Sequence, residues 1–79
     1  MKWQAHVYEV FEDQKRDEKA RQVKTFSFDA ESVDAAEPAA KKWLTDRKLL
    51  DETRRVRSFS HLAGEERAVA IVVSVPRLG

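Results

Sequence analysis

The first eleven residues alternate between apolar and polar side chains. Trp3, Ala5 and Val7 fall on one side of an extended segment, and polar residues separate them. Because successive side chains of a strand point to opposite faces of a sheet, the pattern predicts a half-buried strand over residues 3–11. Residues 12–19 include seven charged side chains. Such a segment does not bury itself, and it predicts a solvated hairpin loop.

Residues 20–28 predict a second strand, because they are rich in Val, Thr and Phe. Val23 falls out of phase with Phe26 and Phe28 in this segment. Two explanations are open: a β-bulge interrupts the strand, or Val23 lies on the open face of the sheet.

A helical period replaces the alternation after Asp29. Apolar residues then recur mostly three or four positions apart and form one stripe of an amphipathic helix. The stripe consists of Val33, Ala36, Ala40, Trp43 and Leu44. Since alanine is small, the helix can lie close to a sheet while Trp43 fills the space at one end. Leu49 and Leu50 are expected to close the core beneath the loop that follows.

Two residues are candidates for the start of this helix. Ser32 can serve as the N-cap, or Asp34 can do so with Glu37 three residues later, as in a capping box. Pro38 bears on the choice, because proline is tolerated in the first turn and costs about 3 kcal/mol deep inside a helix. This favours Asp34, or a short first turn followed by a kink.

Residues 53–62 and 67–75 predict a second hairpin, with Gly64 free to adopt a positive φ in the turn between them. The last run is apolar on both sides, which is typical of a central strand or of one covered on both faces. Pro76 ends it. The chain therefore predicts a single α+β domain over residues 1–79. Its sheet is four-stranded and largely antiparallel, with one helix packed on one face, in the order β-β-α-β-β.

Composition excludes several functional classes. The chain of 79 residues has no cysteine, which removes disulfides and cysteine-based metal sites. Its two glycines cannot form a phosphate-binding glycine-rich loop. Fifteen Lys and Arg balance fourteen Asp and Glu, so no strong net field attracts nucleic acid or a membrane. The N-terminus resembles no signal peptide and no long apolar run is present. We therefore expect a cytoplasmic protein that does not bind membranes.

One helix can cover only one face of a four-stranded sheet, so the other face must meet water, a partner or a ligand. The first strand contributes His6 and Tyr8 to this open face. Two registers of the third strand are open, because Val56 and Leu62 compete with Phe59 for the core. One register exposes Arg55, Arg57, Phe59 and His61, and the other exposes Arg54, Val56, Ser58 and Ser60.

A candidate binding surface combines the outward residues of the first strand, those of the third strand in the first of these registers, and two cations of the charged loop. Its residues are His6, Tyr8, Lys15, Arg16, Arg55, Arg57, Phe59 and His61. Rings interleaved with guanidinium groups suit single-stranded nucleic acid, because bases stack on rings at about 1–3 kcal/mol each and cations hold the phosphates. The alternative is a solvated sheet face with ordinary cross-strand pairs.

No catalytic residues are predicted. His6 and His61 could meet across the sheet if their strands were near neighbours, but no Ser, Asp or Glu is spaced to complete a triad. Two histidines without a third ligand make a poor metal site. We therefore expect a protein that is not an enzyme and that needs neither a metal nor a cofactor.

Residues 26–32 lead from a strand, through a small residue and a cap, into a helix lined by Ala36, Ala39, Ala40 and Trp43. Together with the β-β-α-β-β order, this segment resembles small phage anti-CRISPR proteins, which inhibit type I CRISPR surveillance complexes. The likeness is one of architecture and length, and no binding residue is carried over from it. It implies a non-enzymatic inhibitor that occupies a nucleic-acid-binding surface of a larger ribonucleoprotein.

Three functions follow as hypotheses. The first is a small binding module whose open face and charged loop engage a protein or ribonucleoprotein partner, in the manner of a phage-type inhibitor. The second is direct binding of single-stranded nucleic acid by the same face. The third is a homodimer paired through open faces or edge strands, because Ala68, Ala70 and Val72 form an apolar strip.

Overall fold

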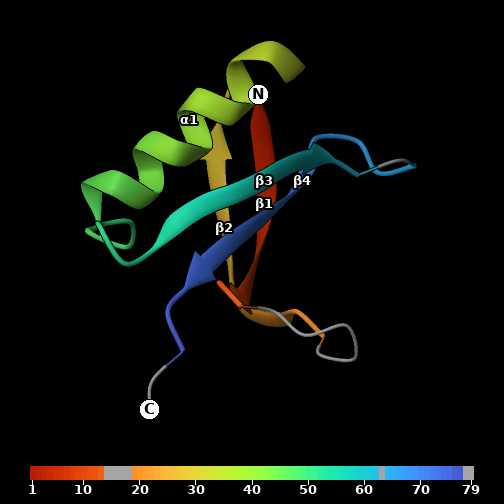
Figure 1. The fold of residues 1–79 in the computed structure, drawn as a ribbon. Helices are drawn as coiled ribbons and strands as arrows, with labels where there is room; N and C mark the ends of the chain where they lie inside the picture. Colours follow the sequence, from red (N-terminus) through yellow and green to blue (C-terminus); the bar gives the residue numbers. More distant parts are fainter. Residues whose placement is uncertain (14–18, 63, 78–79) are drawn as a thin grey trace.

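The computed structural model describes residues 1–13, 19–62 and 64–77. It confirms the predicted α+β class and the order β-β-α-β-β (Figure 1). The elements are β1 (Lys2–Phe11), β2 (Arg21–Asp29), α1 (Val33–Asp46), β3 (Arg55–His61) and β4 (Ala68–Val75). No helix in the described ranges combines the length and the apolar character that crossing a membrane requires.

The four strands form one sheet in the order β2-β1-β4-β3. Both predicted hairpins are present, since β1 pairs with β2 and β3 pairs with β4 in antiparallel fashion. The two central strands, β1 and β4, run parallel, a pairing that needs a long crossover connection. The chain from β2 through α1 to β3 provides it. β4 lies in the centre of the sheet. This confirms that its apolar character on both sides is that of a central strand.

A bulge interrupts β2 at Val23. Val7 pairs with Lys24 and Tyr8 pairs with Gln22, so Val23 has no partner on β1. Val23 borders a small cavity on the helix side of the sheet, together with Leu44. The bulge is therefore the correct explanation for the phase of Val23. The alternative, that Val23 lies on the open face, was wrong.

A second bulge, in β3, overturns both registers considered for this strand. Val56 pairs with Val73, but Ser58 pairs with Val72, so Arg57 is the extra residue. The strand thus changes phase at Arg57. Before the bulge the strand follows the register that exposes Arg55. After the bulge it follows the register that exposes Ser58 and Ser60.

The helix begins at the earlier of the two predicted positions and not at the favoured one. Ser32 is the N-cap, and its Oγ accepts a hydrogen bond from the Ala35 amide at 3.2 Å. The prediction of Asp34 was wrong, and Pro38 lies inside the helix. Two interactions favour the earlier start, the Ser32 cap and the burial of Ala36, and they outweigh the one helical hydrogen bond that proline removes.

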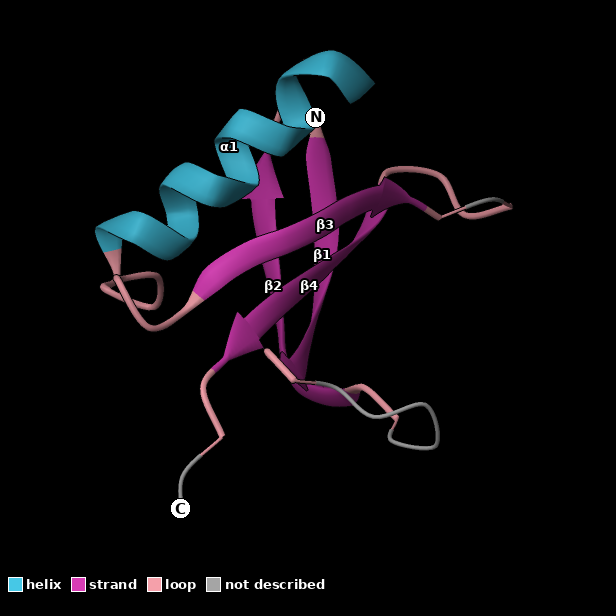
Figure 2. Cartoon of the chain, in the orientation of Figure 1, coloured by secondary structure: helices cyan, strands magenta, loops and turns pink. Residues whose placement is uncertain are grey.

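The core lies between α1 and one face of the sheet (Figure 2). Its buried members from the sheet are Trp3, Ala5, Val7, Phe26, Phe28, Val69, Ile71 and Val73, and those from the helix are Ala36, Ala40 and Leu44. At the β2 side the ring of Trp43 stacks on Phe26, with centroids 3.8 Å apart and planes at 6°. The guanidinium of Arg47 covers the ring of Trp43 at 3.8 Å. The stack closes the core at this edge.

Candidate functional site

The face of the sheet turned away from α1 is the first candidate surface. We call it the open face and define it by the outward residues of the two central strands, which are Gln4, His6, Tyr8 and Val10 from β1 and Ala68, Ala70, Val72 and Ser74 from β4. His6 lies beside Ala70, and Tyr8 lies beside Val72. Tyr8 and Val72 are half-buried, so the centre of this face presents aromatic and aliphatic surface within polar surroundings.

Polar side chains of β2 border this face. The Nε2 of Gln22 lies 3.3 Å from Nδ1 of His6 and donates to Oγ1 of Thr25 at 3.0 Å. Gln22 can donate to His6 only when Nδ1 of the ring carries no proton.

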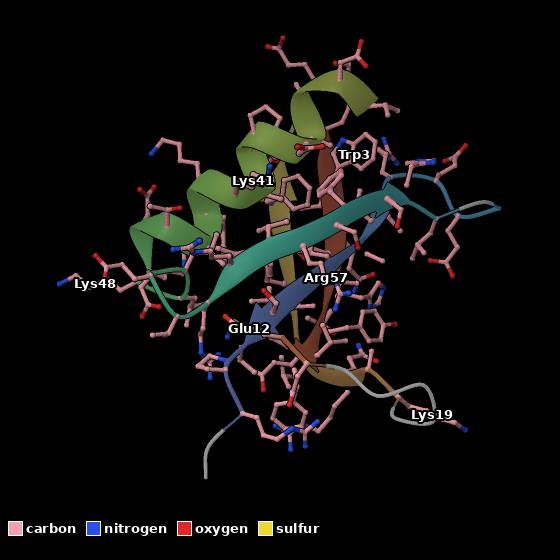
Figure 3. All side chains as sticks on the ribbon, in the orientation of Figure 1. Trp3, Glu12, Lys19, Lys41, Lys48 and Arg57 are labelled. Atoms are coloured by element: carbon pink, nitrogen blue, oxygen red, sulfur yellow. The ribbon has the colours of Figure 1, made fainter. Side chains whose placement is uncertain are left out.

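The open face receives only some of the residues predicted for it. His6 and Tyr8 lie there as expected, and Arg55 joins them because it pairs with Ser74. Arg57 is exposed at the bulge, on the side of β3 away from α1 (Figure 3). Lys15 and Arg16 lie outside the described residues.

The placement of Phe59 and His61 on the open face was wrong. Phe59 pairs with Ile71 and packs against the core. His61 contacts the ring of Trp3 edge-on, with centroids 5.7 Å apart. His6 and His61 therefore lie on opposite faces with β4 between their strands, and they cannot meet. The bulge at Arg57 causes the error, because an extra residue exchanges the two faces for everything that follows.

A second candidate surface lies on the helix side of the sheet, at the end where β1 and β4 finish. It is an open groove of about 590 Å³. We call it the arginine groove, and it is lined by Glu9, Phe11, Arg21, Thr53, Arg54, Val75, Pro76 and Arg77. Its three arginines come from the start of β2, the residue before β3 and the chain that follows β4.

Glu9 organises the floor of the arginine groove. Its Oε1 lies 3.2 Å from Nη2 of Arg21, and its Oε2 lies 3.1 Å from Nη1 of Arg54. The Glu9 side chain is only 12% exposed, and a carboxylate so placed needs partners for its charge. This site was not identified from the sequence. One signal could have indicated it, because Glu9 continues the inward phase of Trp3, Ala5 and Val7, where an acidic residue requires cationic neighbours.

Two further contacts shape this end of the molecule. The guanidinium of Arg77 lies 4.2 Å from the ring centroid of Phe11, and its Nε donates to Asp13 at 2.9 Å. Asp51 holds the start of β3, because its Oδ1 accepts hydrogen bonds from the amides of Thr53 and Arg54 and from the Thr53 hydroxyl. These hydrogen bonds lower the pKa of the Asp51 carboxyl, and the bond from the Thr53 side chain has the largest effect. They also hold the backbone of Arg54 in place beside the groove.

Among the residues that the structure describes, no group of three or more His, Asp or Glu side chains could hold a metal ion. The chain matches no protein-family model, no curated protein and no solved structure.

Proposed function

We propose that this protein is a small binding module, not an enzyme, and that its open face docks onto a protein or a ribonucleoprotein. A single observation carries the proposal: α1 covers one side of the sheet, and Tyr8 and Val72 lie side by side on the other. An aromatic and aliphatic centre with a polar rim is the usual anatomy of a protein interface. Tyrosine and arginine are also enriched among the residues that dominate binding energy.

The resemblance to phage anti-CRISPR proteins names the first partner to try. An inhibitor of this kind would cover a nucleic-acid-binding surface of a type I CRISPR surveillance complex. Arg55 and Arg57 lie on or beside the open face, where they can pair with acidic groups of a protein partner. Tyr8 would supply the buried anchor at the centre of the contact.

The proposal is tested by comparing three immobilised proteins: native, Tyr8→Ala with Arg55→Glu, and Lys42→Glu. Lys42 lies on α1, on the other side of the molecule, and is exposed. Each is presented with purified type I surveillance complexes and with a host lysate. A partner retained by native protein and by Lys42→Glu, but lost from the double variant, supports the proposal. Equal retention by all three refutes the open face as the docking surface, and circular dichroism confirms that each variant is folded.

Direct binding of single-stranded nucleic acid is the second candidate function. The observation that favours it is the placement of His6, Tyr8 and Arg55 on one sheet face, because rings can stack on bases while guanidinium groups hold phosphates. Fluorescence anisotropy with labelled oligonucleotides at low salt tests it. Binding that weakens steeply with salt is expected, and the absence of binding at low salt refutes it.

The homodimer hypothesis now rests on a smaller surface. Ala68 is already buried within one chain, so Ala70 and Val72 are what remain of the apolar strip on β4. Light scattering across a concentration series distinguishes a dimer from a monomer.

A further inference from the structure

The arginine groove is separate from the open face, because Glu9 and Arg54 lie on the helix side of the sheet. The residues that line it include three arginines and one carboxylate, so the lining as a whole is positively charged. A structural ion pair needs only one cation for each carboxylate. Arg77 is paired with Asp13, which lies outside the lining, so the three arginines exceed the two carboxylates Glu9 and Asp13 by one positive charge.

The two arginines that flank Glu9 are arranged as a pair. Each oxygen of Glu9 contacts one guanidinium through a single nitrogen, Nη2 of Arg21 and Nη1 of Arg54. A guanidinium has five N–H donors, so most donors of both arginines are not used by Glu9. The side chains of Arg21 and Arg54 are 77% and 48% exposed, and a ligand can reach these donors. Glu9 thus holds both cations at one carboxylate, one on each of its oxygens.

The remaining walls of the groove are apolar. Phe11, Val75 and Pro76 line it, and Arg77 lies over the Phe11 ring. A volume of about 590 Å³ is within the range of small-molecule sites and well above the size of one inorganic anion. The groove therefore offers apolar surface to an organic group that carries the anion.

We propose that the arginine groove binds an organic phosphate, with the phosphate oxygens on the N–H donors of Arg21 and Arg54 that Glu9 does not use and the organic group against Phe11 and Pro76. Phosphate fits this pair better than a carboxylate does. It carries up to two negative charges and presents three oxygens, so two guanidinium groups can each form parallel N–H···O bonds with it.

Phenyl phosphate and inorganic phosphate are the probes. Each is titrated into the full chain, and the Nε–H signals of the arginine side chains are followed by NMR. Phenyl phosphate is expected to shift the signals of Arg21 and Arg54 and to bind more tightly than inorganic phosphate. Unmoved signals of Arg21 and Arg54 overturn the site. Equal affinity for the two probes overturns the role of the apolar wall, and with it the organic ligand.

The matched variants are Arg54→Gln and Arg55→Gln. They remove the same charge from adjacent residues, but only Arg54 lines the groove. Arg54→Gln is expected to weaken phenyl phosphate binding about tenfold, the loss typical of one charge-assisted hydrogen bond. Arg55→Gln is expected to leave that binding unchanged, and equal effects of the two variants overturn the assignment.

Arg21→Gln serves as the second variant of the groove, because Arg21 is largely exposed and its loss leaves Glu9 paired with Arg54. Weakened binding of phenyl phosphate by Arg21→Gln supports the site, and unchanged binding overturns it. The open-face variant Tyr8→Ala with Arg55→Glu leaves the groove residues in place. Failure of the groove proposal is therefore distinguishable from failure of the proposed docking function.

Discussion

Leu44 is the largest fully buried side chain of α1. The other fully buried residues of the helix, Ala36 and Ala40, are small, whereas Leu44 is large and only 2% exposed. Leu44→Ala removes apolar carbon equivalent to about three methylene groups, at about 0.8 kcal/mol each. The cavity left behind adds to this cost.

The surroundings of Leu44 limit the cavity term. Leu44, Leu49 and Leu50 already line a cavity of about 170 Å³, so neighbouring side chains have space to move into the gap. We therefore expect Leu44→Ala to reduce the unfolding free energy by about 3 kcal/mol, which is near the lower end of the range for alanine substitutions of buried leucines. For a domain of this size such a loss is a large part of the total stability, and it lowers the Tm by at least about 10 °C.

Urea unfolding followed by far-UV circular dichroism and by tryptophan fluorescence measures this loss. Val33→Ala is the matched control, since Val33 lies on the same helix but is 54% exposed. Its unfolding free energy is expected to change by less than about 0.5 kcal/mol. A loss below about 1 kcal/mol for Leu44→Ala, with an unchanged urea dependence, would refute the packing argument, because a buried leucine cannot be removed so cheaply.

Two further predictions concern the ends of elements. Ser32→Ala is expected to reduce the unfolding free energy by about 1 kcal/mol, since it removes the N-cap hydrogen bond; Asp34→Ala should cost less than half as much in the same urea experiment, and the reverse order would contradict Ser32 as the cap. Asp51 has a folded-state pKa below its ordinary value of 3.8, so its contribution to stability is present above that value and is lost as the pH falls through the folded pKa. Asp51→Asn is expected to make the unfolding free energy fall less steeply on acidification, as measured by urea unfolding at several acidic pH values; an unchanged slope would show that the hydrogen bonds to Asp51 do not stabilise the fold.

The local pattern of apolar and polar residues was sufficient to predict the helix and the strands. Period-two and helical spacing predicted four strands and one helix in the correct order, and the phase of Val23 gave the bulge in β2 as one of two explanations. The apolar character of residues 67–75 on both sides indicated that this strand could lie in the centre of the sheet. These features depend on neighbours along the chain, because strand and helix periods are set by backbone geometry and by which side chains must be buried.

The placement of the surfaces depended on pairing between distant segments. The bulge at Arg57 exists only against β4, and it alone moves Phe59 and His61 to the helix side while Arg55 stays on the open face. The start of α1 follows the Ser32 cap and the burial of Ala36 and not the preference of proline. Local propensities differ by a few kcal/mol at most, and tertiary burial can exceed them.

The arginine groove shows the same dependence most clearly. Arg21, Arg54 and Arg77 are far apart in sequence, and the parallel pairing of β1 with β4 brings their segments to one end of the sheet. Glu9 was the one local sign of the groove, an acidic residue in an inward phase. Its partners could not be named from the chain alone, because strand order is decided by how the whole core packs and not by the residues near Glu9.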